Sequence, residues 1–213
     1  MEGNIPSVKV AILGNSGVGK TCIIHRFLKN EFKENSLSTR GADYAQKKVI
    51  TKDQAINLDI WDTAGQEQYR SLGIHFYKEA YIIILVYDIT NRKSFEDLKN
   101  IWYNDLKRNG EKFTVLAIVG NKSDMFEVEA ITEEEGRKFA EEVNALYMLV
   151  SAKNGDNIEN LFRIVASKYL DPFFQDKVEE IAKNNEPGGS IKIKKLTKKE
   201  EQKIIKSRKK GWC

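Results

Sequence analysis

The sequence has few of the features that build disulfide-rich or membrane-spanning proteins. Its two cysteines, Cys22 and Cys213, do not provide a disulfide framework or a zinc site. The longest apolar run, residues 80–87, is far shorter than the roughly 20 residues that a helix needs to cross a bilayer. Residues 1–7 lack the basic start and apolar stretch of a signal peptide, and the chain has no internal repeat. We therefore expect a soluble cytosolic protein.

Positive charge is concentrated near the C-terminus. Residues 190–210 contain ten Lys/Arg and two Asp/Glu, a local charge of +8, whereas the whole chain has a net charge of +4. The remainder is therefore mildly acidic, at −4, which argues against the nucleic-acid-binding domain that the pI of 8.8 alone would suggest. We predict one folded domain over residues 1–171 and a basic tail over residues 172–213. Residues 171–183 could extend as a helix, but Pro187, Gly188 and Gly189 break any regular element. The segment beyond them is rich in Lys and has few apolar residues, so we expect it to be disordered in isolation.

Predicted strands and helices alternate between residues 8 and 170. The patterns predict strands at 8–13, 43–51, 55–61, 80–87, 113–119 and 146–150, with a hairpin turn at 52–53. They predict helices at 19–29, 91–106, 132–144 and 158–169, a short irregular helix at 67–79, and a capping box between Thr132 and Glu135. This order favours an α/β fold with a mostly parallel six-stranded sheet flanked by helices, whose polar motifs meet at the carboxyl ends of the strands.

Residues 14–21, GNSGVGKT, match the phosphate-loop pattern G-x-x-x-x-G-K-[ST] at every fixed position. A predicted strand leads into the loop and a predicted helix leaves it, which favours a P-loop NTPase fold over a simple glycine turn with a surface lysine. Lys20 would reach the β- and γ-phosphates, and the Thr21 hydroxyl would ligate Mg²⁺. The residues predicted to hold the nucleotide here are Ser16, Gly17, Val18, Gly19, Lys20, Thr21 and Cys22.

A second motif, residues 62–66 (DTAGQ), follows the third predicted strand. Asp62 can hold Mg²⁺, usually through water, and Gly65 offers a backbone N–H to a terminal phosphate. Gln66 can orient the attacking water, so we take Gln66 and Lys20 as the catalytic candidates. D-x-x-G is a weak signal alone, but its place after a phosphate loop and a hairpin strengthens it.

Two further motifs point to guanine. In residues 121–124 (NKSD), the carboxylate of Asp124 matches the N1–H and N2 amine of guanine, whereas adenine would leave it unpaired. The stem of Lys122 can lie over the base, and Asn121 more simply joins neighbouring loops. In residues 151–153, which are Ser151, Ala152 and Lys153, the Ala152 N–H could donate to the guanine O6 and Lys153 could cover the ring.

With these motifs in place, residues 7–170 resemble the Ras-like small GTPases, and among them most closely the Rab family. The resemblance rests on residues 39–44 (TRGADY), 57–61 (NLDIW), 68–72 (QYRSL), 76–80 (FYKEA) and 85–90 (LVYDIT). It implies a GDP/GTP switch that hydrolyses GTP slowly, is stimulated by an activating protein, and recruits effectors in vesicular membrane traffic. It also implies an exchange factor, a GDP-dissociation inhibitor, and residence at the cytoplasmic face of intracellular membranes, in exchange with the cytosol.

The resemblance assigns roles to five further residues. Thr39 would ligate Mg²⁺ only when GTP is bound, and Phe32 would flank the guanine. Tyr44, Trp61 and Phe76 would form the aromatic trio that Rab effectors contact, although the same residues could instead be hairpin core.

The chain departs from the Rab pattern in the effector loop, at Ser36 and Arg40, and at its C-terminus. Arg40 stands where an aliphatic residue is usual, so it either changes which partner docks or is simply a solvated arginine. The chain ends in the single Cys213, without a C-a-a-X box. We expect Cys213 to be prenylated and the basic tail to add a second membrane signal, although a charge run can also be merely solvated. Two rival functions stay open, a nucleotide-binding adaptor that does not hydrolyse GTP and a member of another small-GTPase branch.

Overall fold

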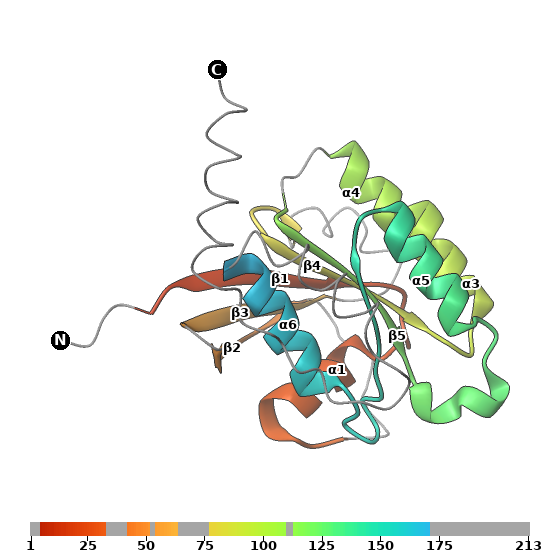
Figure 1. Ribbon diagram of the computed structural model, residues 1–213, viewed down its shortest axis with the longest axis horizontal. Helices are drawn as coiled ribbons and strands as arrows, with labels where there is room; N and C mark the ends of the chain where they lie inside the picture. The colour runs from red at the N-terminus through yellow and green to blue at the C-terminus, as the bar shows by residue number, and fades with distance from the viewer. Residues whose placement is uncertain (1–4, 33–41, 52–53, 64–76, 110–112, 171–213) are drawn as a thin grey trace, which may run out of the picture. The chain divides into compact units, whose positions relative to one another are not determined.

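The computed structural model describes residues 5–32, 42–51, 54–63, 77–109 and 113–170 (Figure 1). The chain divides into two units, Met1–Pro172 and Phe173–Cys213, and every described residue belongs to the first. The predicted boundary at residue 171 and the basic tail therefore stay predictions, as does most of the helix expected at 67–79. Over the described ranges, none of the helices has the length and apolarity needed to cross a membrane.

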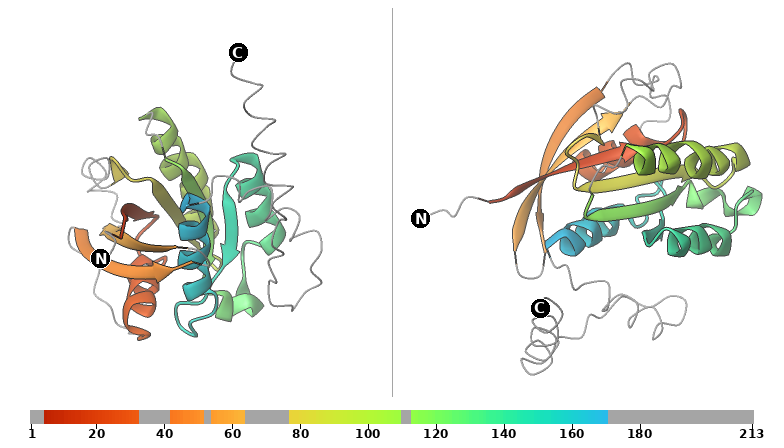
Figure 2. Two further views of the ribbon diagram at one scale, coloured as in Figure 1. Left: turned by 60° about the vertical axis from the view of Figure 1, so that its left-hand side comes forward. Right: turned by 90° about the horizontal axis from the view of Figure 1, so that it is seen from above.

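A six-stranded sheet forms the centre of the domain, in the order β2-β3-β1-β4-β5-β6. Only the β2–β3 hairpin is antiparallel, and the remaining pairs are parallel, which confirms the predicted architecture. The hairpin lies at one edge of the sheet, and helix α5 (Glu133–Glu142) lies beside the opposite edge (Figure 2). The strands are β1 (Ser7–Leu13), β2 (Ala42–Ile50), β3 (Ala55–Thr63), β4 (Ile82–Asp88), β5 (Val115–Asn121) and β6 (Leu146–Leu149).

Helices pack on both faces of the sheet and create two apolar cores. On one face, α1 (Lys20–Lys29) and α6 (Ile158–Leu170) meet through stacked Phe27 and Phe162 rings, whose centroids are 3.8 Å apart. On the other face lie α3 (Arg92–Asp97), α4 (Asn104–Arg108) and α5 (Glu133–Glu142). Every residue of β4 and β5 is buried, as expected for parallel strands that are covered on both sides. The sheet is thus a rigid support for the loops at its carboxyl edge.

The helix predicted over residues 91–106 is confirmed, but it is not a uniform α-helix. α3 and α4 are joined by a π-helical segment, η2 (Leu98–Tyr103). Apolar residues recur every four positions from Leu98 and Trp102 in η2 to Leu106 in α4, and all three are buried. A four-residue repeat drifts off one face of a helix with 3.6 residues per turn, whereas the wider π turn keeps the three side chains facing the sheet.

The predicted capping box at α5 is only half formed. The hydroxyl of Thr132 accepts a hydrogen bond from the Glu135 N–H at 3.2 Å, as a capping residue should. The Glu135 carboxylate does not complete the box, because it forms an ion pair with Arg92. That ion pair ties the start of α5 to the start of α3.

Candidate nucleotide-binding site

Two glycines shape the loop between β1 and α1. Gly14 has a φ of +144°, and a Cβ there would lie 2.2 Å from the carbonyl oxygen of Val86. Gly19 has a φ of +94°, and a Cβ there would lie 2.3 Å from the Nδ2 of Asn121. Any larger residue would push the loop away from β4 and β5. α1 begins directly after Gly19, so the positive end of its dipole lies at the loop, where an anion is favoured.

Lys20 is a buried cation inside this loop. Its ammonium donates to the carbonyl oxygens of Gly14 at 2.8 Å and Asn15 at 2.9 Å, and only 5% of the residue is exposed. Burial lowers the pKa of Lys20 to about 8, against the opposing effect of the Asp62 charge. An anionic phosphate at the loop would favour the charged form of Lys20, which the protein alone disfavours.

Thr21 and Asp62 bring an alcohol and a carboxylate together at the mouth of the same loop. The Thr21 Oγ1 donates to the Asp62 Oδ2 at 2.6 Å, and Asp62 is 4% exposed. Within the described residues, the other carboxylate oxygen, Oδ1, has no hydrogen-bond partner although it is buried. Burial raises the pKa of Asp62, while the Thr21 hydrogen bond and the Lys20 charge lower it. Oxygen ligands of this kind suit Mg²⁺, so the residues fit the ion that the sequence predicts.

Asn121 joins the phosphate loop to the loop after β6. Its Nδ2 donates to the carbonyl oxygen of Val18 at 2.8 Å, and its Oδ1 accepts from the N–H of Ala152 at 3.2 Å. Asn121 is 1% exposed, so both contacts are shielded from water. The predicted joining role of Asn121 is confirmed, and the Ala152 N–H is seen to donate to Asn121.

The carboxylate of Asp124 lies against the same loop. The Ser151 hydroxyl donates to the Asp124 Oδ1 at 2.6 Å, and Ser151 is buried. Lys122 has a left-handed backbone, with a φ of +68°, and its ammonium lies 2.6 Å from the Asp88 Oδ2. Three loops that follow β1, β5 and β6 therefore meet at one edge of the sheet, as the positions of the motifs predict.

Sequence reasoning missed two groups of contacts at this edge. Asn15 donates through Nδ2 to Asp97 at 2.7 Å and accepts from the indole N–H of Trp102 at 2.8 Å, which ties the phosphate loop to α3 and η2. Arg26 on α1 donates to the carbonyl oxygens of Ala152 and Lys153. No local sequence pattern predicts either group, because the partners are 82 to 127 positions apart.

The other predicted nucleotide contacts vary in exposure. In the phosphate loop, Ser16 and Gly17 are exposed and Val18 is buried. Cys22 and Phe32 are partly buried against the core that α1 and α6 form. In the loop after β6, Ala152 is buried and Lys153 is exposed.

The aromatic trio is only partly described. Tyr44 and Trp61 face each other across the β2–β3 hairpin, with ring centroids 5.6 Å apart in an edge-on arrangement. Tyr44 is 51% exposed, so it is not hairpin core. The predicted residues that lie outside the described residues are Thr39, Arg40, Gly65, Gln66, Phe76 and Cys213.

Comparison with known proteins identifies the family. The family model described as Ras family matches residues 9–171. The chain is 39% identical to Ras-related protein RABA1h of Arabidopsis thaliana, over 76% of this chain and 78% of that protein. It is 38% identical to Ras-related protein Rab5A of Oryza sativa subsp. japonica, over 78% and 81%, and 35% identical to Ras-related protein Rab-8A of Bos taurus, over 89% and 88%. The chain therefore belongs to the Ras family and is a divergent Rab-like small GTPase, which binds guanine nucleotide, hydrolyses GTP and acts in membrane traffic.

Proposed function

We propose that residues 14–21 hold the phosphates of Mg²⁺-bound GTP, with Lys20 and Thr21 as the fixed contacts. The observation that carries this proposal is the buried oxygen pair of Thr21 and Asp62, in which the Asp62 Oδ1 has no partner among the described residues. Mg²⁺ would be held by Thr21 and, directly or through water, by Asp62, with Thr39 added in the GTP state. When bound, it would neutralise charge on the phosphate oxygens.

Removing the Asp62 charge tests the metal site. Asp62→Asn keeps the size of the side chain but removes a charged ligand, so in Mg²⁺ GDP should dissociate faster from this variant than from the wild type. Adding EDTA should then accelerate GDP dissociation less for the variant than for the wild type. Asp43→Asn is the matched control, because Asp43 is an exposed carboxylate opposite Asp62 in the hairpin register. Equal EDTA responses of Asp62→Asn and the wild type would contradict the site.

Base recognition is assigned to the two loops that Asn121 joins. The Asp124 carboxylate would accept from N1–H and the N2 amine of guanine. The Ala152 N–H, which reaches the Asn121 Oδ1 at 3.2 Å, would share its hydrogen between that oxygen and the guanine O6. Lys122 and Lys153 would cover the two faces of the ring, and Phe32 would flank it. The short Ser151–Asp124 contact supports this arrangement, because it fixes the carboxylate relative to Ala152.

The γ-phosphate would be sensed by Thr39 and Gly65 and attacked by a water that Gln66 orients, while Lys20 stabilises the developing charge. Loss of the γ-phosphate would release both loops, which makes them the switch. We propose that intrinsic hydrolysis is slow and that an activating protein supplies further catalytic groups. An exchange factor would then accelerate GDP release and complete the cycle.

Effectors would dock on the hairpin surface around Tyr44 and Trp61, together with Phe76. The half-exposed Tyr44 supports this, because an aromatic ring exposed beside a second ring suits protein recognition. Arg40, inside the same region of the sequence, would bias the choice of partner.

Membrane attachment is assigned to Cys213 and the basic tail. We propose that Cys213 carries a prenyl chain, that the +8 segment adds attraction to anionic lipids, and that a GDP-dissociation inhibitor extracts the protein. The protein would then cycle between the cytosol and the cytoplasmic face of intracellular membranes. Mass spectrometry of the protein from its native cells tests this, and an unmodified Cys213 would contradict the anchored state.

A further inference from the structure

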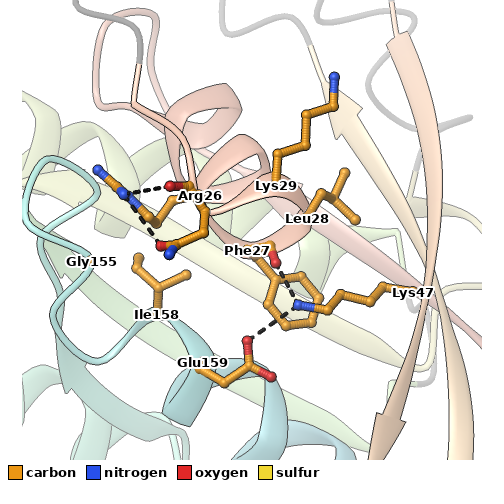
Figure 3. Close-up of a pocket in the computed structure, with 9 residues that line it drawn as sticks. Arg26, Phe27, Leu28, Lys29, Lys47, Gly155, Ile158 and Glu159 are labelled. Atoms are coloured by element: carbon orange, nitrogen blue, oxygen red, sulfur yellow. Dashed lines mark hydrogen bonds and ion pairs between the residues drawn. The ribbon is translucent and has the colours of Figure 1, made fainter.

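The C-terminal end of α1 lies beside a cavity of about 480 Å³ that is lined from α1, β2 and the start of α6 (Figure 3). Three cations line it: Arg26 and Lys47 are engaged with protein groups, and Lys29 is exposed. The bonds of Arg26 and Lys47 show which elements these two cations hold together.

Arg26 makes four hydrogen bonds from one guanidinium. Its Nε donates to the Ala152 carbonyl at 2.9 Å, and one terminal nitrogen donates to the Lys153 carbonyl at 2.6 Å. The other terminal nitrogen donates to the Asn30 carbonyl at 2.9 Å and to its Oδ1 at 3.3 Å. The rigid guanidinium thus fixes the spacing between the end of α1 and the loop after β6.

Capping of α1 does not require the contacts to that loop. Helix ends need partners for their last carbonyl groups, and the bond to Asn30 together with the N–H of Asn30 on Arg26 serves this purpose locally. The bonds to Ala152 and Lys153 reach 126 and 127 positions along the chain. Gly155, with a φ of +90°, lets the loop return so closely that a Cβ there would lie 3.5 Å from the Arg26 Cδ.

Lys47 provides the comparison within the same cavity. Its ammonium donates to the Phe27 carbonyl at 2.5 Å, lies 3.3 Å from the Glu159 carboxylate and stands over the Phe27 ring, 3.9 Å from the centroid (Figure 3). Lys47 therefore ties α1 to β2 and α6, and its recorded contacts do not include residues 151–153. The two cations stabilise the same helix end, but only Arg26 holds the loop assigned to the base.

We propose that Arg26 is a positioning residue for base recognition. By holding the carbonyl groups of Ala152 and Lys153, it fixes the backbone that carries the Ala152 N–H and keeps Lys153 beside the base. Through Asn30 it also positions the segment that leads to Phe32. It thereby sets both the dwell time of the nucleotide and the preference for guanine. This inference rests on the proposed assignment of residues 151–153 to the base.

The test compares GDP and ADP on the full chain carrying Arg26→Gln, Arg26→Lys or Lys47→Gln. Dissociation of a fluorescent GDP is followed after adding excess unlabelled GDP, and ADP affinity is measured by competition. Arg26→Gln should release GDP about tenfold faster, since hydrogen bonds from a charged group are lost, while its ADP affinity stays unchanged. Arg26→Lys lacks the planar set of donors, so its rate of GDP release should lie between those of the wild type and Arg26→Gln. Lys47→Gln should release GDP at a rate within about twofold of the wild type, but its melting temperature should be lower.

The outcomes separate the possible failures. A wild-type rate of GDP release from Arg26→Gln, or an equal loss of GDP and ADP affinity, would overturn the positioning role. If Arg26→Gln does not fold, Arg26→Lys decides in the same way, because it keeps the charge at the helix end. A wild-type chain with no preference for GDP over ADP would instead overturn the base assignment on which the inference rests.

Discussion

Changing Asn121 to aspartate should weaken nucleotide binding, because the hydrogen bond to the Val18 carbonyl is lost and two oxygen atoms face each other instead. The substitution preserves shape, but it replaces the Nδ2 donor by an oxygen that faces the Val18 carbonyl oxygen at about the observed 2.8 Å. Asn121 is 1% exposed, so water cannot replace the lost donor. A buried polar group left unsatisfied costs about 1–3 kcal/mol, or about 5- to 150-fold in affinity, and the added charge acts in the same direction.

The assay is the dissociation rate of GDP from the full chain, with thermal unfolding measured in parallel. Asn121→Asp should release GDP at least about fivefold faster than the wild type, and the defect should shrink at low pH, where a protonated carboxyl can donate to Val18. Asn100→Asp is the matched control, because Asn100 is exposed on the surface of η2. A GDP dissociation rate within twofold of wild type for Asn121→Asp would refute the reasoning.

Three further perturbations address other parts of the domain. Trp102→Phe removes the indole N–H that Asn15 accepts, so GDP should dissociate several-fold faster in the same assay, and an unchanged rate would contradict a link between η2 and the loop. Gly136→Ala places a Cβ 2.4 Å from the Tyr87 hydroxyl oxygen, so the free energy of unfolding measured by denaturant titration should fall by about 1–3 kcal/mol. The rate of GDP release should be unchanged. In nucleotide-free protein the pKa of Lys20 is about 8 rather than 10.5, so between pH 8 and pH 10.5 the unfolded chain binds more protons than the folded chain. The free energy of unfolding should therefore rise by up to about 3 kcal/mol as the pH increases across this range. Lys20→Met should remove that rise, and a pH profile equal to that of the wild type would contradict it.

Local patterns predicted the architecture because each strand and each motif is contained in a short window. The phosphate loop, for example, is defined by glycine spacing and by the strand and helix that flank it, and the structure places both where expected. The meeting of Asn121 with Ala152 followed from the rule that parallel strands bring their carboxyl ends together.

Contacts between distant side chains could not be predicted in this way. Nothing in the neighbourhood of Arg26 distinguishes it from a solvated helical arginine, and its partners are known only once α1 packs beside α6. The π turn was missed because the apolar pattern from Phe95 to Leu106 suits an ordinary helix nearly as well. Glu135 fits the capping-box spacing, but Arg92 from another helix competes for its carboxylate.

Single-turnover hydrolysis of GTP in Mg²⁺ tests the central claim most directly. The protein is loaded with GTP, and release of phosphate is followed for the wild type and for Gln66→Leu, with and without a Rab-type activating protein. We predict slow conversion of GTP to GDP and phosphate by the wild type, acceleration by the activating protein, and a marked loss of both in Gln66→Leu. A wild-type chain that binds GTP but releases no phosphate under either condition would contradict the account.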